Sequence, residues 1–134
     1  MTAERLSEEA QLLADPRLSQ AIARFNAAEW YACHDGFEEL WHETAGPMRP
    51  VLQGILQIAV AHLHLERSNL RGATILLGEG LGRLQGCGAQ ALGLDLELLR
   101  CCAAARLQAL QSGAALEHLP LPFLQTVGAG SCDL

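Results

Sequence analysis

Lysine is absent from this sequence, so all nine of its positive charges are arginines, and fifteen acidic residues outnumber them. The formal net charge is -6, and the arginines form no basic run. A nucleic-acid partner needs a basic face that neutralises its phosphates. The charge balance therefore argues against nucleic acid as a partner.

Paired cysteines, a targeting segment and a membrane span are also missing. The five cysteines contain no Cys-x-x-Cys pair, and an odd number suits buried, reduced thiols. The first fifteen residues carry three glutamates, where a signal peptide would have a basic patch and then an apolar run. The longest uncharged stretch, between Arg49 and Glu66, is shorter than the ~18–20 apolar residues of a membrane span. We therefore expect a cytoplasmic protein that does not contact a membrane.

Patterns typical of β-strands are missing as well. Leu and Ala dominate, whereas Val, Ile and Thr are few, and no alternating run reaches strand length. Half of the 134 residues are hydrophobic, which is enough for one folded domain. We predict an all-α fold, a compact bundle of about five to six antiparallel helices in a single domain over residues 1–134, with its core at about 17–112. The apolar surplus also predicts a homo-oligomer, most simply a dimer.

Apolar spacing and turn signals set the expected elements. The helix at 48–67 is apolar on most sides, so it should be the central, most buried one. Residues 86–93 should form a loop, and the tail at 119–134 should lie extended across the core, with its last residues, from 128, frayed. The predicted helices cover residues 7–14, 17–27, 30–43, 48–67, 70–86 (fading toward its end) and 95–111.

Three glycines interrupt the helix expected from residue 70. Gly78, Gly80 and Gly82 each cost that helix ~1 kcal/mol relative to Ala. Either another helix packs very close to this segment, or the segment is soft. Both alternatives stay open at the level of sequence.

A weak internal repeat has a spacing of about forty residues. Residues 25–33 match residues 65–73, and each segment crosses a tight turn between two expected helices. The pattern resembles the helix-turn-helix of tetratricopeptide units, in which a small residue at the start of the second helix lets the pair close. Such arrays need about three copies, and this repeat has two. The repeat therefore predicts antiparallel helix pairs rather than a peptide-binding solenoid.

The helix expected at 30–43 contains a stripe of aromatic and polar residues. The two tryptophans indicate an inward face, so the polar members of the stripe should point inward too. A buried, ionised Glu is costly unless it is paired, hydrogen-bonded or bound to a metal. Four residues fall within about 80° of one another at 100° per residue: Trp30, His34, Glu38 and Trp41.

The next helix carries a matching stripe, because Gln53, Gln57 and His64 lie within about 40° of one another. Two neighbouring helices most simply turn their polar stripes toward each other. That arrangement would bring the glutamine amides together with His34, Glu38 and His64. Two imidazoles and one carboxylate suit a Zn, Fe or Mn ion with an open position for water.

A purely structural interpretation of the same residues stays open. An i, i+4 contact between His34 and Glu38, closed by the glutamine amides and by Arg49, would satisfy every polar group without a metal. Arg49 either binds an anionic substrate or neutralises Glu38, and we favour neutralisation. Asp35 and Glu39 lie toward the flank of their helix, where such residues are most often solvated or paired with Arg.

An ordered series of motifs runs through residues 21–84. The series is Phe25-Asn26, Glu29-Trp30-Tyr31, His34-Asp35-x-x-Glu38-Glu39-x-Trp41 and Arg49-x-x-Leu52-Gln53-Gly54, followed by Gln57, His64, Asn69 and Gly72-Ala73. It resembles the helical family called domain of unknown function 309. This resemblance implies a small all-helical bundle and the label of a predicted metal-dependent hydrolase, which names no substrate.

The resemblance also carries a polar pattern onto this chain, with two departures. Leu63 stands where a second His of a His-His pair would be common, and this weakens any scheme that needs adjacent His ligands. Gly80 stands where Ala is usual, which affects how its helix packs. The positions that match the pattern are His34, Glu38, Arg49, Gln53, Gln57 and His64.

The first function hypothesis is a metal-dependent hydrolase. His34, Glu38 and His64 would hold a divalent ion that converts a bound water to hydroxide. Asp35 or Glu39 would be the nearest spare base.

The second hypothesis is a non-catalytic helical interaction or oligomerisation module. Its groove would be lined by Trp30, Tyr31 and their neighbours, and its buried polar seam would be structural. A solvent-connected pocket at the polar residues favours chemistry, whereas a sealed, fully hydrogen-bonded seam favours structure.

Overall fold

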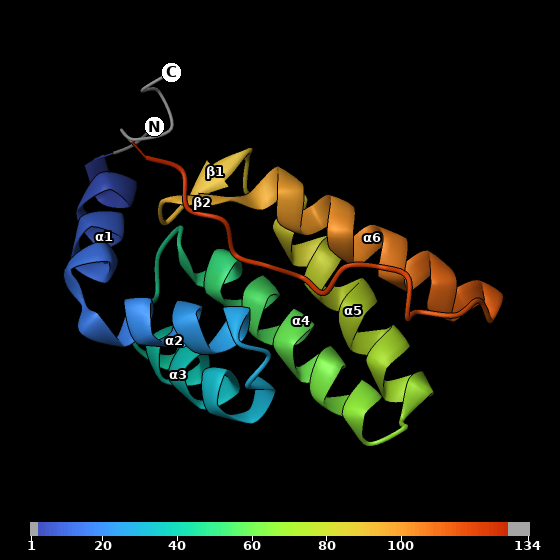
Figure 1. Cartoon of the computed structure of the whole chain (residues 1–134). Helices are drawn as coiled ribbons and strands as arrows, with labels where there is room; N and C mark the ends of the chain where they lie inside the picture. Colours follow the sequence, from blue (N-terminus) through green and yellow to red (C-terminus); the bar gives the residue numbers. More distant parts are fainter. Residues whose placement is uncertain (1–2, 129–134) are drawn as a thin grey trace.

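The computed structural model describes residues 3–128 and contains six helices and one short β-hairpin within that range (Figure 1). The predicted all-α bundle is confirmed, and the third helix has the predicted bounds. The hairpin is a correction, because the expected loop at 86–93 contains a strand that pairs with the strand after it. The elements are α1 (Ala3–Ala14), α2 (Pro16–Asn26), α3 (Trp30–Glu43), α4 (Arg49–Glu66), α5 (Leu70–Leu84), β1 (Gln90–Ala91), β2 (Leu94–Asp95) and α6 (Leu96–Ser112).

Capping side chains set two of the helix starts. Asp15 accepts a hydrogen bond from the backbone N–H of Arg17 at 2.9 Å, and Pro16 occupies the first turn of α2, where its missing N–H costs nothing. Asp95 accepts from the backbone N–H of Leu98 at 2.9 Å, so it lies just before α6 rather than within it. These caps explain why both helices begin one residue away from the predicted positions.

The predicted repeat is a true structural repeat, because α2–α3 and α4–α5 are joined by the same turn. One residue in each turn has a positive φ, 59° at Ala28 and 58° at Ser68. The N–H of the next residue, Glu29 or Asn69, donates to a carbonyl five residues back, at 2.9 Å and 2.8 Å. After their first residue, α3 and α5 also share the same order of buried and exposed positions. The expected pairs of antiparallel helices are therefore present.

Helix α4 is the central helix, as predicted, and packs against both α3 and α5. Half of its eighteen residues are buried, because apolar side chains occur on most of its sides. Within residues 3–128, no helix combines the length and the apolar character of a membrane span.

Helices α4 and α5 approach each other most closely at two glycines. A Cβ atom added to Gly80 would lie 2.9 Å from the carbonyl oxygen of Gly54. One added to Gly54 would lie 2.6 Å from the side chain of Leu84. A Cβ atom added to Gly82 would have no neighbour within 4 Å, and one added to Gly78 would meet one methyl group at 3.9 Å. Close packing therefore explains Gly80, but it does not explain the other two glycines of α5.

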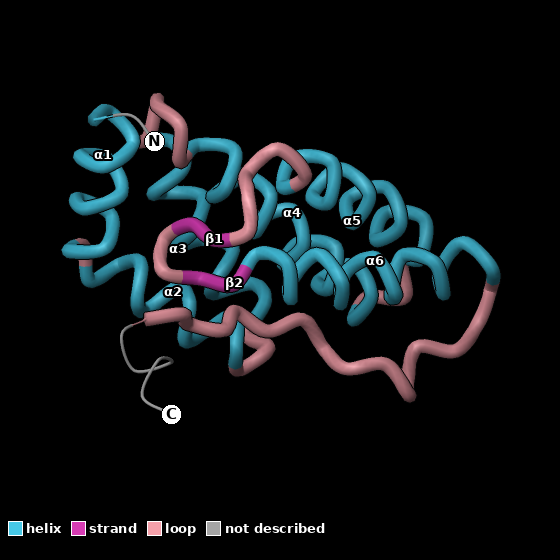
Figure 2. Tube along the Cα trace, turned by 90° about the horizontal axis from the view of Figure 1, so that it is seen from above, coloured by secondary structure: helices cyan, strands magenta, loops and turns pink. Residues whose placement is uncertain are grey.

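The segment after α6 runs extended back across the bundle (Figures 1 and 2). Leu124 is buried, and the Asn26 side chain bonds to both its backbone N–H (2.7 Å) and its carbonyl (3.0 Å). Thr126 forms an isolated bridge with Leu94. The part of the predicted tail at 119–128 is extended in the structure, and most of the segment predicted to fray, 129–134, lies outside the described residues.

Two buried basic side chains connect α4, α6 and the tail. Nε of Arg106 donates to Nε2 of His62 at 2.9 Å, and Nδ1 of His62 donates to the carbonyl of Ile58 at 2.8 Å. Nη1 of Arg106 donates to the carbonyls of Leu119 and Pro120 at 3.2 Å and 3.1 Å. The arginine thus needs a neutral imidazole as its acceptor, and it holds the start of the tail against the core.

We expect G80A to lower the free energy of unfolding by about 1–3 kcal/mol, because the new methyl group meets backbone that cannot move aside. G82A, in open space on the same helix, should instead raise it by up to about 1 kcal/mol. Urea denaturation of the two variants measures both effects. Equal effects of the two substitutions would contradict the close contact between α4 and α5.

Stability should also fall in acid through His62. Burial lowers the pKa of this imidazole from 6.5 to about 4, and the nearby Arg106 charge adds to the shift. Between these two pH values the unfolded state binds the proton and the folded state does not. The contribution of the neutral imidazole to the free energy of unfolding is therefore fully present above pH ~6.5. It is lost as the pH falls, by about 3 kcal/mol at pH ~4.

Urea denaturation between pH ~7 and pH ~4.5 measures this decline. H62Q removes the titrating group and should show a flatter dependence on pH than the wild type, while H118Q, at an exposed loop position, should keep the wild-type slope. A wild-type slope in H62Q would show that His62 is not the group responsible.

Candidate metal site on helix α3

Helix α3 buries a different stripe from the one predicted. Its core-facing residues are Trp30, which the predicted stripe included, and Cys33, Phe37 and Leu40, which each lie one position before a predicted member. His34 and Glu38 instead lie at the edge of the core, with side chains 25% and 44% exposed. The expectation of a fully inward polar face is therefore wrong, because Cys33, Phe37 and Leu40 form the more apolar face.

His34, Asp35 and Glu38 form a compact group at this edge. One possible ligand atom from each lies within 4.8 Å of the other two. Nδ1 of His34 lies 3.2 Å from Oδ1 of Asp35, and Nε2 lies 3.8 Å from Oε2 of Glu38. The imidazole therefore has one carboxylate beside each ring nitrogen. The sequence placed Asp35 only on the flank of the helix, although a residue at i+1 reaches a histidine when its side chain folds back.

The structure does not bring His64 or Gln57 into this group. Nε2 of Gln57 donates to Oε1 of Glu79 at 3.1 Å, and Nδ2 of Asn69 donates to Nδ1 of His64 at 3.1 Å. Both partners belong to α5 or to its cap, because this stripe of α4 lies on the side where α5 packs. Gln53 is half-buried on the same stripe. The expected face-to-face arrangement of the α3 and α4 stripes is therefore not found.

Arg49 binds the end of α3 rather than Glu38. Its Nη1 donates to the carbonyls of Trp41 and Thr44 at 2.8 Å and 3.0 Å. Its guanidinium also lies 4.2 Å from the centroid of a Trp41 ring, a cation–π distance. In the described part of the chain no ion pair joins Arg49 to Glu38. The favoured neutralisation is thus replaced by a helix cap, in which the guanidinium is a cationic donor to two carbonyls at the end of α3.

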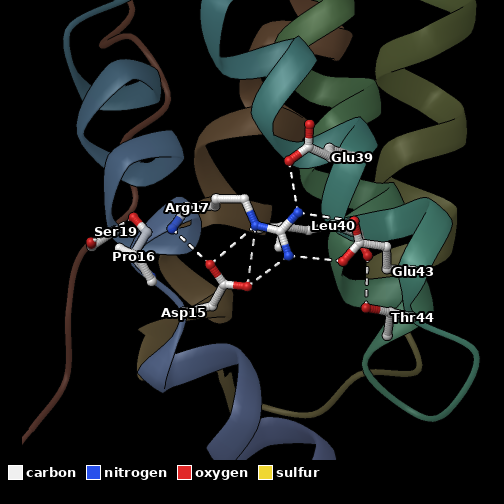
Figure 3. A network of polar contacts seen from close by, with 8 residues as sticks. All are labelled: Asp15, Pro16, Arg17, Ser19, Glu39, Leu40, Glu43 and Thr44. Atoms are coloured by element: carbon white, nitrogen blue, oxygen red, sulfur yellow. Dashed lines mark hydrogen bonds and ion pairs between the residues drawn. The ribbon is translucent and has the colours of Figure 1, made fainter.

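Glu39, one of the two candidate bases, is held by Arg17 at the start of α2 (Figure 3). The guanidinium lies 2.7 Å from Glu39, 2.8 Å from Glu43 and 2.8 Å from Asp15. Hydrogen bonds from Arg17 lower the pKa values of Glu43 and Asp15. This agrees with the expectation of an arginine pair on the helix flank, and it leaves Glu39 engaged in joining α2 to α3.

A shallow apolar depression of about 400 Å³ lies next to the group. Tyr31 lines it and also lies beside His34, with 6.0 Å between the ring centroids. We call it the Trp30 depression, because Trp30 provides its aromatic wall and was expected to line a groove. Its lining residues are Ala28, Glu29, Trp30, Tyr31, Ala32, Leu63 and Glu66.

Buried polar atoms are left without hydrogen-bond partners on the predicted stripes of α3 and α4. They are Nδ1 of His34, Nε1 of Trp41 and Oε1 of Gln57. The short distance from His34 to Asp35 does not have hydrogen-bond geometry. The described residues therefore do not form a seam in which every polar group is hydrogen-bonded to another protein group. Such atoms are available to water or to a ligand.

Comparison with known families agrees with the series of motifs in the sequence. Residues 18–76 match the model of a family described as Domain of unknown function (DUF309). This chain resembles DUF309. The DUF309 match covers both copies of the repeated turn and includes the whole His34–Asp35–Glu38 group, but the family description assigns no activity. No curated protein matches the sequence.

We expect R49Q to lower the free energy of unfolding by about 1–2 kcal/mol, because two carbonyls at the end of α3 and the Trp41 ring lose their cationic partner. R71Q, at an exposed position of α5, is the matched control and should change stability by less than about 0.5 kcal/mol. Urea denaturation distinguishes them. An R49Q protein as stable as R71Q would show that the cap contributes nothing.

Proposed function

We propose that this protein binds a divalent metal ion through His34, Asp35 and Glu38 and uses it in hydrolysis. The observation that supports this proposal is the approach of three ligand atoms to within 4.8 Å on an edge of α3 that solvent reaches. Three protein ligands leave coordination positions open for a water and a substrate, which is typical of catalytic rather than structural sites.

The donor set fits such an ion. One imidazole nitrogen and two carboxylates suit Zn, Fe or Mn. The buried Nδ1 of His34 has no hydrogen-bond partner among the described residues, as expected of an atom that a ligand could satisfy. When bound, such an ion would lower the pKa of a coordinated water, to about 7 in the case of Zn²⁺, and would so supply hydroxide.

The surrounding residues position this group. Asp35 lies beside Nδ1 of the His34 ring and Glu38 beside Nε2, so an ion at either ring nitrogen would have a carboxylate within reach. Glu39 is paired with Arg17, so it is less suited to act as a base than the sequence indicated. Tyr31 connects the group with the Trp30 depression, so a substrate seated there would lie beside the ligands.

We expect calorimetric titration of the metal-free protein with Zn²⁺ or Mn²⁺ to show one ion per chain. H34A should abolish this binding, and D35N and E38Q should each weaken it by about tenfold or more, as expected for lost ligands. H42A removes an exposed histidine of the same helix and should bind as the wild type does. Chromogenic esters and phosphoesters then test hydrolysis, which E38Q should reduce.

H64A decides between the two ligand sets. Because His64 contacts Asn69 instead of the group, we expect H64A to bind the ion with unchanged affinity. If H64A lost as much affinity for the ion as H34A, the third ligand would be His64 and not Asp35. The absence of binding to the wild type would refute the proposal.

A further inference from the structure

We propose that the Trp30 depression is a binding site for a small primary amine with an apolar chain. This inference goes beyond the metal site and does not require an ion to be bound. It rests on the shape, the apolar lining and the charge of the depression.

The shape follows from the first of the two repeated turns. The positive φ of Ala28 turns the chain sharply into α3, and the small side chains of Ala28 and Ala32 leave space at the surface. Trp30 and Leu63 supply apolar walls from α3 and α4. The resulting volume of about 400 Å³ lies within the ~300–1,000 Å³ typical of small-molecule sites. The depression therefore has room for a short alkyl or aryl chain against its apolar walls.

The charge favours a cation. Glu29 and Glu66 both line the depression, and neither carboxylate forms a hydrogen bond or ion pair with another described residue. No basic residue is among the lining residues. An ammonium group has three N–H donors, and carboxylates are its strongest hydrogen-bonding partners. Two uncommitted carboxylates beside apolar walls thus match an amine with an apolar chain.

The backbone and the aromatic rings are consistent with this choice. The positive N-terminal end of α3 and the negative C-terminal end of α4 meet at the depression, so the two helix dipoles largely offset each other. The carboxylates therefore decide the sign of the local potential. Tyr31 is 60% exposed, and its ring face is available to a cation at the rim.

Titration of the ¹⁵N-labelled protein with n-hexylammonium, followed by NMR, tests the proposal. We expect the backbone amide signals of residues 28–32 and 63–66 to shift, with a dissociation constant in the millimolar range, as for a ligand of few atoms. Hexanol has the same chain without the charge, and hexanoate reverses the charge. Both should bind at least about tenfold more weakly if the carboxylates recognise the ammonium.

Variants separate the carboxylates from the apolar surface. The E29Q/E66Q protein should bind hexylammonium about tenfold more weakly, whereas E117Q, at an exposed loop position, should bind as the wild type does. Unchanged signals elsewhere in the spectrum show that the variants are folded. H34A should keep its affinity for hexylammonium, so this test remains interpretable if the metal proposal fails.

Three outcomes would overturn the amine site. Equal binding of hexanol and hexylammonium would mean a merely apolar patch. Tighter binding of hexanoate would mean that the N-terminal end of α3 decides the specificity. No shifts with hexylammonium at about 20 mM would mean that the depression takes no small amine.

Discussion

The close contact between α4 and α5 is the constraint on which the rest of the structure depends. It brings two backbones together at Gly54 and Gly80, where no Cβ atom fits on either side. This approach turns one side of α4 toward α5, and with it Gln57 and His64. The opposite side of α4 is then free to pack against α3. The position of the α3 edge, and of the group on it, follows from this arrangement.

Among the described residues, the polar group occurs in the first pair of the repeat and not in the second. The α2–α3 and α4–α5 pairs have the same turn and the same order of buried positions, so residues forty apart occupy equivalent sites. At the equivalents of His34 and Glu38, the second pair has Thr74 and Gly78. One copy of the scaffold thus carries the candidate ligand group, and the other provides close helix packing.

The sequence predicted the helices, the central position of α4 and the repeated turns, because these depend on local signals such as apolar spacing and turn residues. It did not predict the contacts that involve distant segments. Arg106 reaches His62 across forty-four residues, and no local pattern marks that pair. The hairpin was missed because two-residue strands are too short to show alternation. The predicted dimer stays a prediction.

The polar residues show the limits of the helical-wheel argument. Two tryptophans indicated that His34 and Glu38 point inward, but the helix instead buries the stripe one position earlier. Trp41 is covered by the guanidinium of Arg49, so an aromatic residue can lie at the edge of a core without marking its centre. Two of the three members of the candidate group were therefore predicted as ligands, and Asp35 was predicted only as a base.

The tail has a consequence for where this fold can be divided. The family match ends at residue 76, within α5 and before Gly80, while Arg106 and Leu124 pack onto the matched part from outside it. A fragment cut at that boundary would lose the glycine contact, expose His62 and leave Asn26 without its backbone partners. The segment that resembles the family is thus a unit of sequence similarity, whereas the contacts that complete its packing extend into the tail.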